Sequence, residues 1–308
     1  MRTPIFHEAW WLDAVAPGRW REVRVEENNR VIARLPFVER RFLNVTMVLA
    51  PPLANRLGPI TDLEVGRTET RLKRFDHIVD ELLAQLPPAD LIRQVLHPDV
   101  VSWLPFHRHG FRIDPQVSYV IDDLSDLDRV WSEVSGHTRR VIKKAGRELT
   151  VARDEDASRL MPMIRATAER RDITVPIAPD AVDRAVRASV ERGRGTVLTA
   201  VDASGVVHAS LFCVWDSDRA WYLGGGGDAV LRSSGAGSLL MWELIKEAAG
   251  RTSRFDFEGS MIPGVERYFR NFGGRQETCY LVTRTSRRLA PVWVLYQKLQ
   301  QGRRTSAA

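Results

Sequence analysis

Apolar residues recur along the chain with two different periods, and segments of the two kinds alternate. Spacings of three or four residues predict helices at 6–16, 68–86, 157–171, 180–191, 238–249 and 265–272, and a broken helical segment over 125–147 that begins with Ser125 as its N-cap. Alternation or short apolar runs predict strands at 21–26, 29–38, 45–50, 91–96, 117–121, 149–153, 196–202, 206–215, 219–223, 255–257 and 277–283. The region 97–116 between strands is expected to be mostly loop. This mixture predicts an α/β (α+β) protein.

The stretch from Gly224 to Gly274 carries the strongest local signal. Four consecutive glycines, 224–227, are followed by Arg232-Ser-Ser-Gly-Ala-Gly237 and then by an almost wholly apolar helix. Glycines at Gly235 and Gly237 allow backbone N–H groups to approach a ligand where this helix begins. The helix dipole adds partial positive charge there, so the pattern predicts a loop that binds phosphate.

Two carboxylates follow this helix on a short strand. Asp256 and Glu258 alternate with Phe255 and Phe257, which are expected to face the core. A carboxylate in such a protected place can act as a base or anchor an amine. The alternative is that Glu258 pairs with a nearby arginine, Arg267 or Arg270, and only holds the corner.

Polar groups around the same stretch are further candidates. Tyr222 and Tyr268 can donate a hydrogen bond to a leaving oxygen or sulfur, although aromatic residues at such positions more often pack in the core. Ser260 can bind substrate or cap the following helix. Together with Arg270, Ser260 and Tyr268 form the expected substrate-binding group.

Basic residues concentrate on the segment that precedes residue 149. The expected phosphate contacts to tRNA are Arg139, Arg140, Lys143, Lys144 and Arg147. Helical spacing places Arg140, Lys144 and Arg147 on the outer face. A solvated helix face is the alternative reading of the same pattern.

Charge and composition narrow the class of protein. The 308 residues carry a net charge of +6 with a pI of about 9.7, which suits a polyanionic partner or reflects an arginine-rich composition alone. No apolar run is long enough for an integral membrane segment, and the N-terminus shows no signal peptide. Two lone cysteines and scattered histidines favour a cytoplasmic protein with no metal site. The basic tail with Trp293, Arg303 and Arg304 is expected to pack and end in solvent rather than touch a membrane.

A faint repeat suggests two related halves. The hairpins at 21–38 and 196–215 share one order: an exposed strand, a polar turn and a more apolar strand. We therefore expect two domains. Residues 1-123 would form a first, possibly degenerate domain, and residues 124-308 the second, which contains the glycine loop and the basic tail.

The second half resembles the GNAT acyltransferase superfamily. The loop from Arg232 to Gly237 matches that superfamily's pyrophosphate pattern, Arg/Gln-x-x-Gly-x-Gly/Ala. Three further matches, at 138–145, 240–248 and 255–274, are similar to the FemAB-type and BioF2-like branch, whose members contain two GNAT-like domains in tandem. The resemblance implies two such domains here, each with a twisted, mixed but mainly antiparallel sheet flanked by helices.

The resemblance also implies a function, namely transfer of an activated acyl group to a small-molecule or peptide amine. No covalent enzyme intermediate and no tightly bound cofactor are expected, since an ester or thioester is already activated. Aminoacyl-tRNA is the expected donor, with Glu258, Tyr222 and Asp256 as catalytic residues. Acyl-CoA is the alternative co-substrate, bound at Arg232, Gly235 and Gly237. A non-catalytic module that binds RNA or a nucleotide is a third reading.

Overall fold

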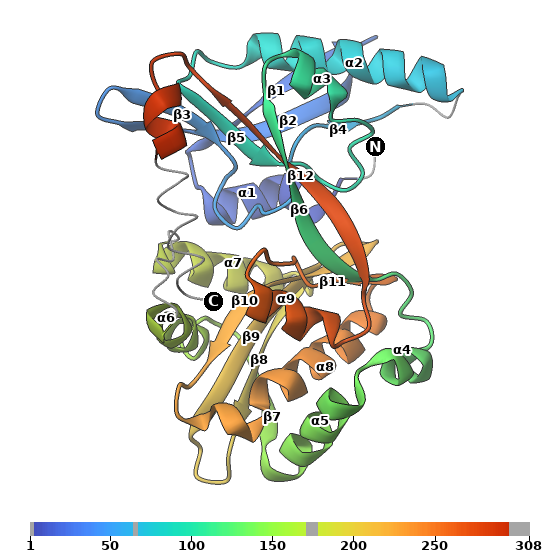
Figure 1. Cartoon of the computed structure of the whole chain (residues 1–308), viewed down its shortest axis with the longest axis vertical. Coiled ribbons are helices and arrows are strands. Elements are labelled where there is room, and N and C mark those ends of the chain that lie inside the picture. The colour runs from blue at the N-terminus through green and yellow to red at the C-terminus, as the bar shows by residue number, and fades with distance from the viewer. Residues whose placement is uncertain (1–2, 64–66, 171–177, 296–308) are drawn as a thin grey trace. The chain divides into compact units, whose positions relative to one another are not determined.

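The computed structural model describes residues 3–63, 67–170 and 178–295 (Figure 1). These residues form two compact units. The first contains the chain up to Gln116 and returns from Thr278 onward, while the second is Val117–Glu277. The units therefore divide the chain differently from the single boundary expected after residue 123, because the last strand lies in the first unit. The division into two related domains, 1-123 and 124-308, stays a prediction.

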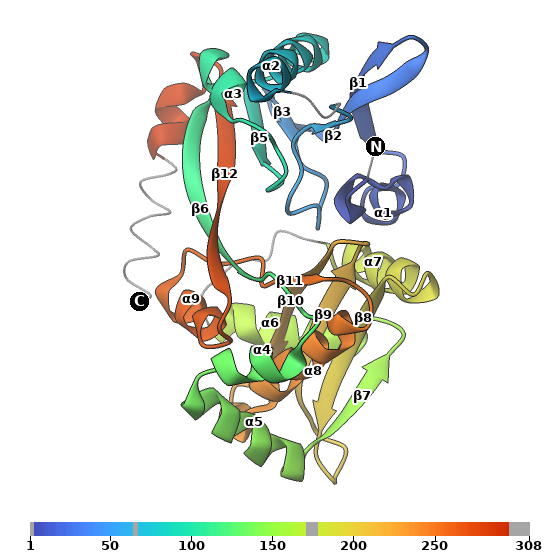
Figure 2. The same ribbon diagram turned by 90° about the vertical axis from the view of Figure 1, so that its right-hand side faces the viewer.

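The first unit is an open sheet with strand order β1-β2-β3-β5-β12, and β4 pairs with β2. Strands β3 and β5 pair in parallel. Helix α2 lies along the sheet, as Figures 1 and 2 show. Its buried residues Phe75, Ile78 and Leu82 belong to the same core cluster as the strand side chains. The elements are η1 Ile5–His7, α1 Ala9–Val15, β1 Trp20–Glu27, β2 Arg30–Phe42, β3 Val45–Leu49, β4 Ile60–Thr61, α2 Thr68–Gln85, β5 Leu91–Val95, α3 Leu104–Arg108 and β12 Arg275–Thr285.

The second unit has strand order β6-β11-β10-β9-β8-β7, with β10 and β11 the parallel pair. Helix α8 packs on the central strands and α5 packs on α8. The elements are β6 Arg112–Ile121, α4 Leu127–Glu133, α5 Gly136–Glu148, β7 Thr150–Asp154, α6 Leu160–Arg170, α7 Pro179–Glu191, β8 Gly195–Val201, β9 Val207–Trp215, β10 Arg219–Gly227, η2 Leu231–Ser234, α8 Ala236–Ala249, β11 Arg254–Asp256 and α9 Pro263–Arg270. The expected mixed α/β class, with open sheets flanked by helices, is confirmed.

The glycine run 224–227 is part of strand β10, so the strand expected at 219–223 is four residues longer than predicted. These residues pair with β9 along Phe212–Ala209. A Cβ added at Gly226 would lie 1.9 Å from the carbonyl oxygen of Met163, and the Gly227 N–H donates to Thr167 Oγ1 at 3.2 Å. The missing side chains thus let α6 lie directly on the strand.

Two other local predictions need correction. Asp126, not Ser125, caps α4, because its carboxylate accepts a hydrogen bond from Arg129 N–H at 3.0 Å. The region expected to be mostly loop contains α3 and the first half of β6. The basic end of the tail, with Arg303 and Arg304, lies outside the described residues.

His7 makes the stability of the first unit depend on pH. Its side chain is fully buried, its Nε2–H donates to the Gly58 carbonyl oxygen at 2.9 Å, and burial lowers its pKa from 6.5 to about 4. Below pH 6.5 the unfolded chain binds a proton that the folded chain does not. The free energy of unfolding therefore decreases as the pH is lowered. From this group alone we expect a loss on the order of 3 kcal/mol between pH 7 and pH 4.

Urea unfolding at several pH values measures this loss. The variant His7→Gln retains an N–H donor for Gly58 but cannot titrate, so its stability is expected to depend less on pH. The exposed His77 provides the control, and His77→Gln should behave as the wild type does. Equal pH dependence in His7→Gln and the wild type would contradict the assignment.

Candidate functional site

The candidate site lies where the parallel strands β10 and β11 of the second unit diverge. Strand β11 ends with the pair Trp221–Asp256, while β10 continues to Gly227 alongside β9 only. The register of β10 shifts between Tyr222 and Gly224, and Gly224 has φ 151°. This bulge redirects β10 at the point where β11 ends. Tyr222 therefore lies at the opening of the fork.

The loop before α8 has the geometry expected of an anion-binding turn. Gly235 is the N-cap with φ 77°, and a Cβ there would lie 2.5 Å from Val141 Cγ1 of α5. Glycine is thus required both by the left-handed backbone and by the close contact with α5. At Gly237, an added Cβ would meet only the Tyr268 hydroxyl, at 3.8 Å. This side of the helix start is open.

The first amides of α8 are only partly used within the protein. Ser238 and Leu239 N–H both donate to the Gly235 carbonyl oxygen, at 3.0 and 3.1 Å, and Ala236 N–H donates to Ser234 Oγ at 3.3 Å. For Gly237 N–H, the described part of the chain supplies no acceptor. One N–H therefore remains for an anion at the positive end of the helix. Arg232 is exposed on η2 directly before it.

Both predicted tyrosines are brought to this loop. The Tyr268 hydroxyl donates to the Gly237 carbonyl oxygen at 3.0 Å. Burial, and next the neighbouring Tyr222, raise the pKa of Tyr268, so it remains protonated at neutral pH. Tyr222 packs edge-on against Phe269, with ring centroids 5.8 Å apart.

Asp256 is buried in a network of polar groups. Its carboxylate accepts hydrogen bonds from Ser118 Oγ and from Arg219 Nη1, the latter at 2.9 Å. Arg219 is itself buried, stacks 5.1 Å from the Trp221 ring and reaches Glu277 at 2.7 Å. The sequence analysis missed Arg219. Its only signal was a charged residue at the start of an apolar strand, next to a polar turn.

Glu258 follows Asp256 in an unusual backbone conformation. Its φ is 60°, Gly259 has φ 65°, and Glu258 N–H donates to Asp256 Oδ1 at 2.8 Å. A Cβ at Gly259 would lie 1.8 Å from the Val117 carbonyl oxygen, so the corner is pressed against β6. Such a conformation persists only where its surroundings hold it. Asp256 and β6 thus fix the position of the partly buried Glu258.

Ser260 and Arg270 have local partners. Ser260 Oγ accepts a hydrogen bond from Ile262 N–H at 3.1 Å, in the turn before α9. Arg270 is exposed and lies 3.8 Å from Glu266, which also accepts a hydrogen bond from the Tyr119 hydroxyl. Their expected role in substrate binding stays a prediction.

The basic residues of α5 divide into two groups. Arg139 closes the end of α4, because Nη1 donates to the carbonyl oxygens of Ser132 at 2.9 Å and Trp131 at 3.2 Å. The exposed members are Arg140, Lys143, Lys144 and Arg147. Since Gly235 contacts α5 at Val141, this charged face belongs to the helix that lies against the anion-binding loop.

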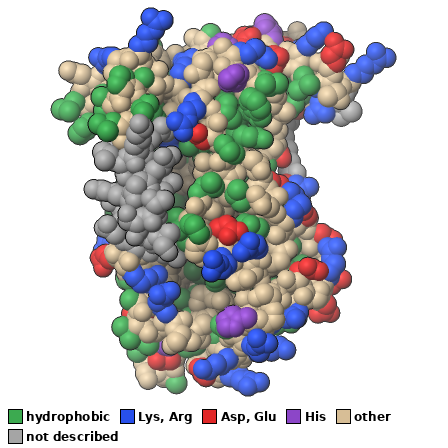
Figure 3. Space-filling view, viewed as in Figure 1, with side chains coloured by type: hydrophobic (Ala, Val, Ile, Leu, Met, Phe, Trp, Pro, Cys, Tyr) green, Lys and Arg blue, Asp and Glu red, His purple; other side chains and the backbone are tan. Residues whose placement is uncertain are grey.

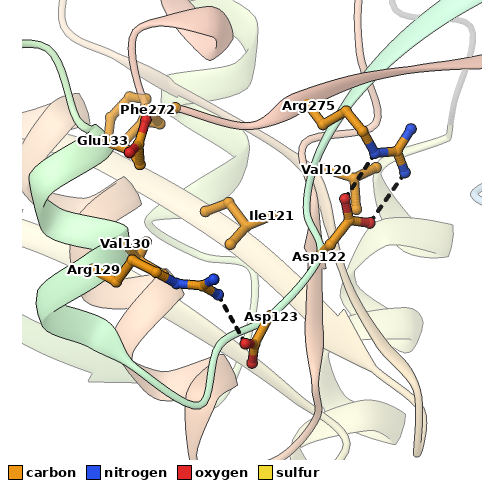
Figure 4. A pocket seen from close by; sticks show the side chains of 10 residues that line it. Val120, Ile121, Asp122, Asp123, Arg129, Val130, Glu133, Phe272 and Arg275 are labelled. Carbon is orange, nitrogen blue, oxygen red and sulfur yellow. Dashed lines mark hydrogen bonds and ion pairs between the residues drawn. The ribbon is translucent and has the colours of Figure 1, made fainter.

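A cavity of about 310 Å³ in the same unit contains none of the predicted site residues. Its rim carries two ion pairs, shown in Figure 4: Arg275 holds Asp122 in two hydrogen bonds of 2.7 and 3.0 Å, and Arg129 holds Asp123 at 2.8 Å. Val120, Ile121, Val130 and Phe272 line the space between these pairs. Two of its three carboxylates, those of Asp122 and Asp123, are held in these pairs, and the groups gathered at the fork of β10 and β11 lie outside the cavity, so the fork remains the candidate site.

The described residues contain neither a candidate metal site nor a candidate membrane-spanning helix. No three His, Cys, Asp or Glu side chains there are grouped so that they could hold a metal ion. Among the helices that the structure covers, none combines the length and apolar character needed to cross a membrane.

Comparison with known families identifies the second unit. Residues 132–270 match the family model for an acetyltransferase (GNAT) domain. This range contains the fork, the α8 loop and the Glu258 corner. The matched segment is a GNAT domain, and the protein that contains it is an acyltransferase. No curated protein sequence matches the chain.

Solved structures with low sequence identity share the fold, and they include FemX and a tandem GNAT protein. The crystal structure of FemX is similar with a TM-score of 0.64 and 11% identity, covering 88% of this chain and 90% of that one. The lysylphosphatidylglycerol synthetase L-PGS from Bacillus licheniformis has a TM-score of 0.57 and 13% identity, covering 94% and 91%. A tandem GNAT protein from the clavulanic acid biosynthesis pathway has a TM-score of 0.51 and 13% identity, covering 90% and 94%.

Proposed function

We propose that this acyltransferase moves an amino acid from aminoacyl-tRNA onto an amine and forms an amide without a covalent enzyme intermediate. The observation that carries the proposal is the contact between the anion-binding loop and the basic helix α5. Gly235 packs on Val141, and the exposed Arg140 and Lys144 lie on the same helix. Such a face extends the phosphate site along a polyanion. Similarity to FemX and to a lysylphosphatidylglycerol synthetase supports the same reaction class.

Each group at the fork has a role in the proposed reaction. The Gly237 N–H and Arg232 would hold donor phosphate, with no tightly bound cofactor. Glu258 would accept the proton that the amine loses as it attacks the carbonyl carbon, and Tyr222 would donate a proton to the leaving oxygen. Asp256 would act as a positioning residue, because its Oδ1 accepts the Glu258 N–H.

Acyl-CoA is the second candidate donor. The open side of Gly237 and the exposed Arg232 are what a coenzyme A pyrophosphate requires. One of the similar structures is described as a tandem GNAT protein without AcCoA, which supports this alternative. Incubation of the purified protein with aminoacyl-tRNA or acetyl-CoA and a panel of amines tests both. Amine-dependent breakdown of one donor identifies it, and breakdown of neither contradicts the proposed enzyme.

Charge reversal on α5 distinguishes aminoacyl-tRNA from acyl-CoA as the donor. In the variant Arg140→Glu/Lys144→Glu, we expect weaker tRNA binding and a slope of log Kd against log salt that is smaller by about 1.5, since two phosphate contacts are lost. Affinity for acetyl-CoA should change much less. Filter binding at several salt concentrations measures the slope.

A matched control carries the same charge change in the first unit. Arg71 and Lys73 are exposed on α2, and Arg71→Glu/Lys73→Glu should leave the salt slope unchanged. An unchanged slope in the α5 variant would remove tRNA from the proposal. Equal effects of the two variants would show only nonspecific attraction.

A further inference from the structure

The turn between β2 and β3 exposes two large apolar side chains in the first unit. Phe42 is 68% exposed and Leu43 is 86% exposed. Phe42 pairs with Val45, so only Leu43 and Asn44 form the turn. Leu43 has φ 51°, a conformation that glycine or asparagine adopts at much lower cost. Both the left-handed backbone of Leu43 and the exposure of its side chain to water cost free energy. This combination points to a contact outside the chain.

The charge around this turn is positive. Arg40 and Arg41 are exposed directly before it, and Arg287 is exposed in the segment after β12. The nearby carboxylates are paired: Glu39 with Arg21 and Arg41, and Asp90 with Arg288. The arginines therefore give the turn a net positive surface.

The turn is fixed to the segment that follows β12. Arg288 donates to the Asn44 carbonyl oxygen and to both oxygens of Asp90, the latter at 2.7 Å each, and holds the pKa of Asp90 well below its usual range. Thr46 N–H donates to the same carboxylate at 3.0 Å. From this junction the chain continues to Val292 and Leu295, which are 61% and 60% exposed.

We call the exposed residues of this turn, with the arginine next to Arg288, the tip surface; it consists of Arg40, Arg41, Phe42, Leu43 and Arg287. Figure 3 shows hydrophobic side chains gathered at this end of the first unit, with Lys and Arg side chains beside them. The tail was expected to pack and end in solvent. In the described part of the tail, Val292 and Leu295 are exposed, so the expected packing does not include them.

We propose that the tip surface binds the anionic surface of a lipid bilayer. Phe42 and Leu43 would enter the headgroup region, and the arginines would lie against lipid phosphates. A bilayer accommodates a protruding apolar turn without a preformed pocket. It also provides the negative charge that complements Arg40 and Arg41. A single apolar anchor binds membranes weakly. The tip surface combines an apolar turn with positive charge, and both are needed for stable binding.

Vesicle co-sedimentation of the full chain tests the proposal. We expect binding to vesicles of phosphatidylglycerol and phosphatidylcholine, and much weaker binding to phosphatidylcholine alone. Leu43→Gly should weaken binding by about tenfold, because one buried leucine side chain is lost. The same variant should be at least as stable as the wild type toward urea, since glycine accepts the positive φ. A merely structural leucine would not give this combination.

Two other variants separate the apolar contribution from the charge. Val230 is also 86% exposed but lies in the second unit, so Val230→Ser should bind vesicles as the wild type does. Arg40→Glu should weaken binding to the anionic vesicles and leave binding to neutral ones unchanged. No preference for anionic vesicles, or unchanged binding by Leu43→Gly, would overturn the proposal. A dimer in sedimentation equilibrium that Leu43→Gly dissociates, without vesicle binding, would assign the surface to a second copy instead.

Discussion

Glu258→Gln should lower kcat by roughly 10²- to 10⁴-fold, the range for loss of a general base. Glutamine matches glutamate in shape but cannot accept the proton that the attacking amine loses. The corner should survive the change, because it is held by Glu258 N–H on Asp256 Oδ1 and by the close contact of Gly259 with β6, neither of which involves the side chain. Donor affinity should therefore stay within about twofold.

Single-turnover measurements with the donor identified above separate chemistry from binding. The control is Glu243→Gln on α8, where the glutamate pairs with Lys246 at 2.6 Å on the solvent side. It should leave both kcat and donor affinity unchanged. An unchanged kcat in Glu258→Gln would remove Glu258 from the mechanism. A parallel loss of donor affinity would make it a binding residue.

Gly259→Ala should destabilise the protein by more than about 4 kcal/mol, or prevent its folding. The new Cβ would lie 1.8 Å from the Val117 carbonyl oxygen and 2.6 Å from Ser118 Cα. Both are backbone atoms of β6, so no side-chain rotation relieves the overlap. The positive φ of 65° adds further strain.

Gly264 gives a close control, five residues further along the chain. It lies in α9, where an added Cβ meets no atom within 4 Å. Gly264→Ala should be neutral or stabilising by up to about 1 kcal/mol, as expected for alanine in a helix. Thermal and urea unfolding measure both variants. Equal stability of the two would contradict the described approach of the corner to β6.

The parts of the site that were predictable from sequence depend on short-range signals. The Gly235 turn, the start of α8 and the burial of Phe255 and Phe257 each follow from residues a few positions apart. The inward face of α5 was likewise readable from helical spacing, since Ile142 and Ala145 are buried. Local propensity and packing agree at these positions, which is why the pattern was sufficient.

The parts that were missed depend on contacts between distant segments. Arg219 meets Asp256 and Glu277, which are 37 and 58 residues away, and no local pattern marks such a pair. The predicted strand ended at residue 223, before the glycines 224–227, because glycine serves both turns and close packing and only the position of α6 distinguishes the two. The left-handed conformation of Glu258 is also imposed by its surroundings rather than by residue type.

Strands β6 and β12 each contribute residues to both units, and this has a consequence for synthesis of the chain. The outer edge of β5 pairs with β12 over Leu281–Thr285, close to the last described residue. A growing polypeptide therefore cannot pair this edge of β5 until residues 281–285 have been synthesised. Strand β1 pairs with the next strand to be made, whereas this edge of β5 stays unpaired until β12 is complete, and there a chaperone would have to act.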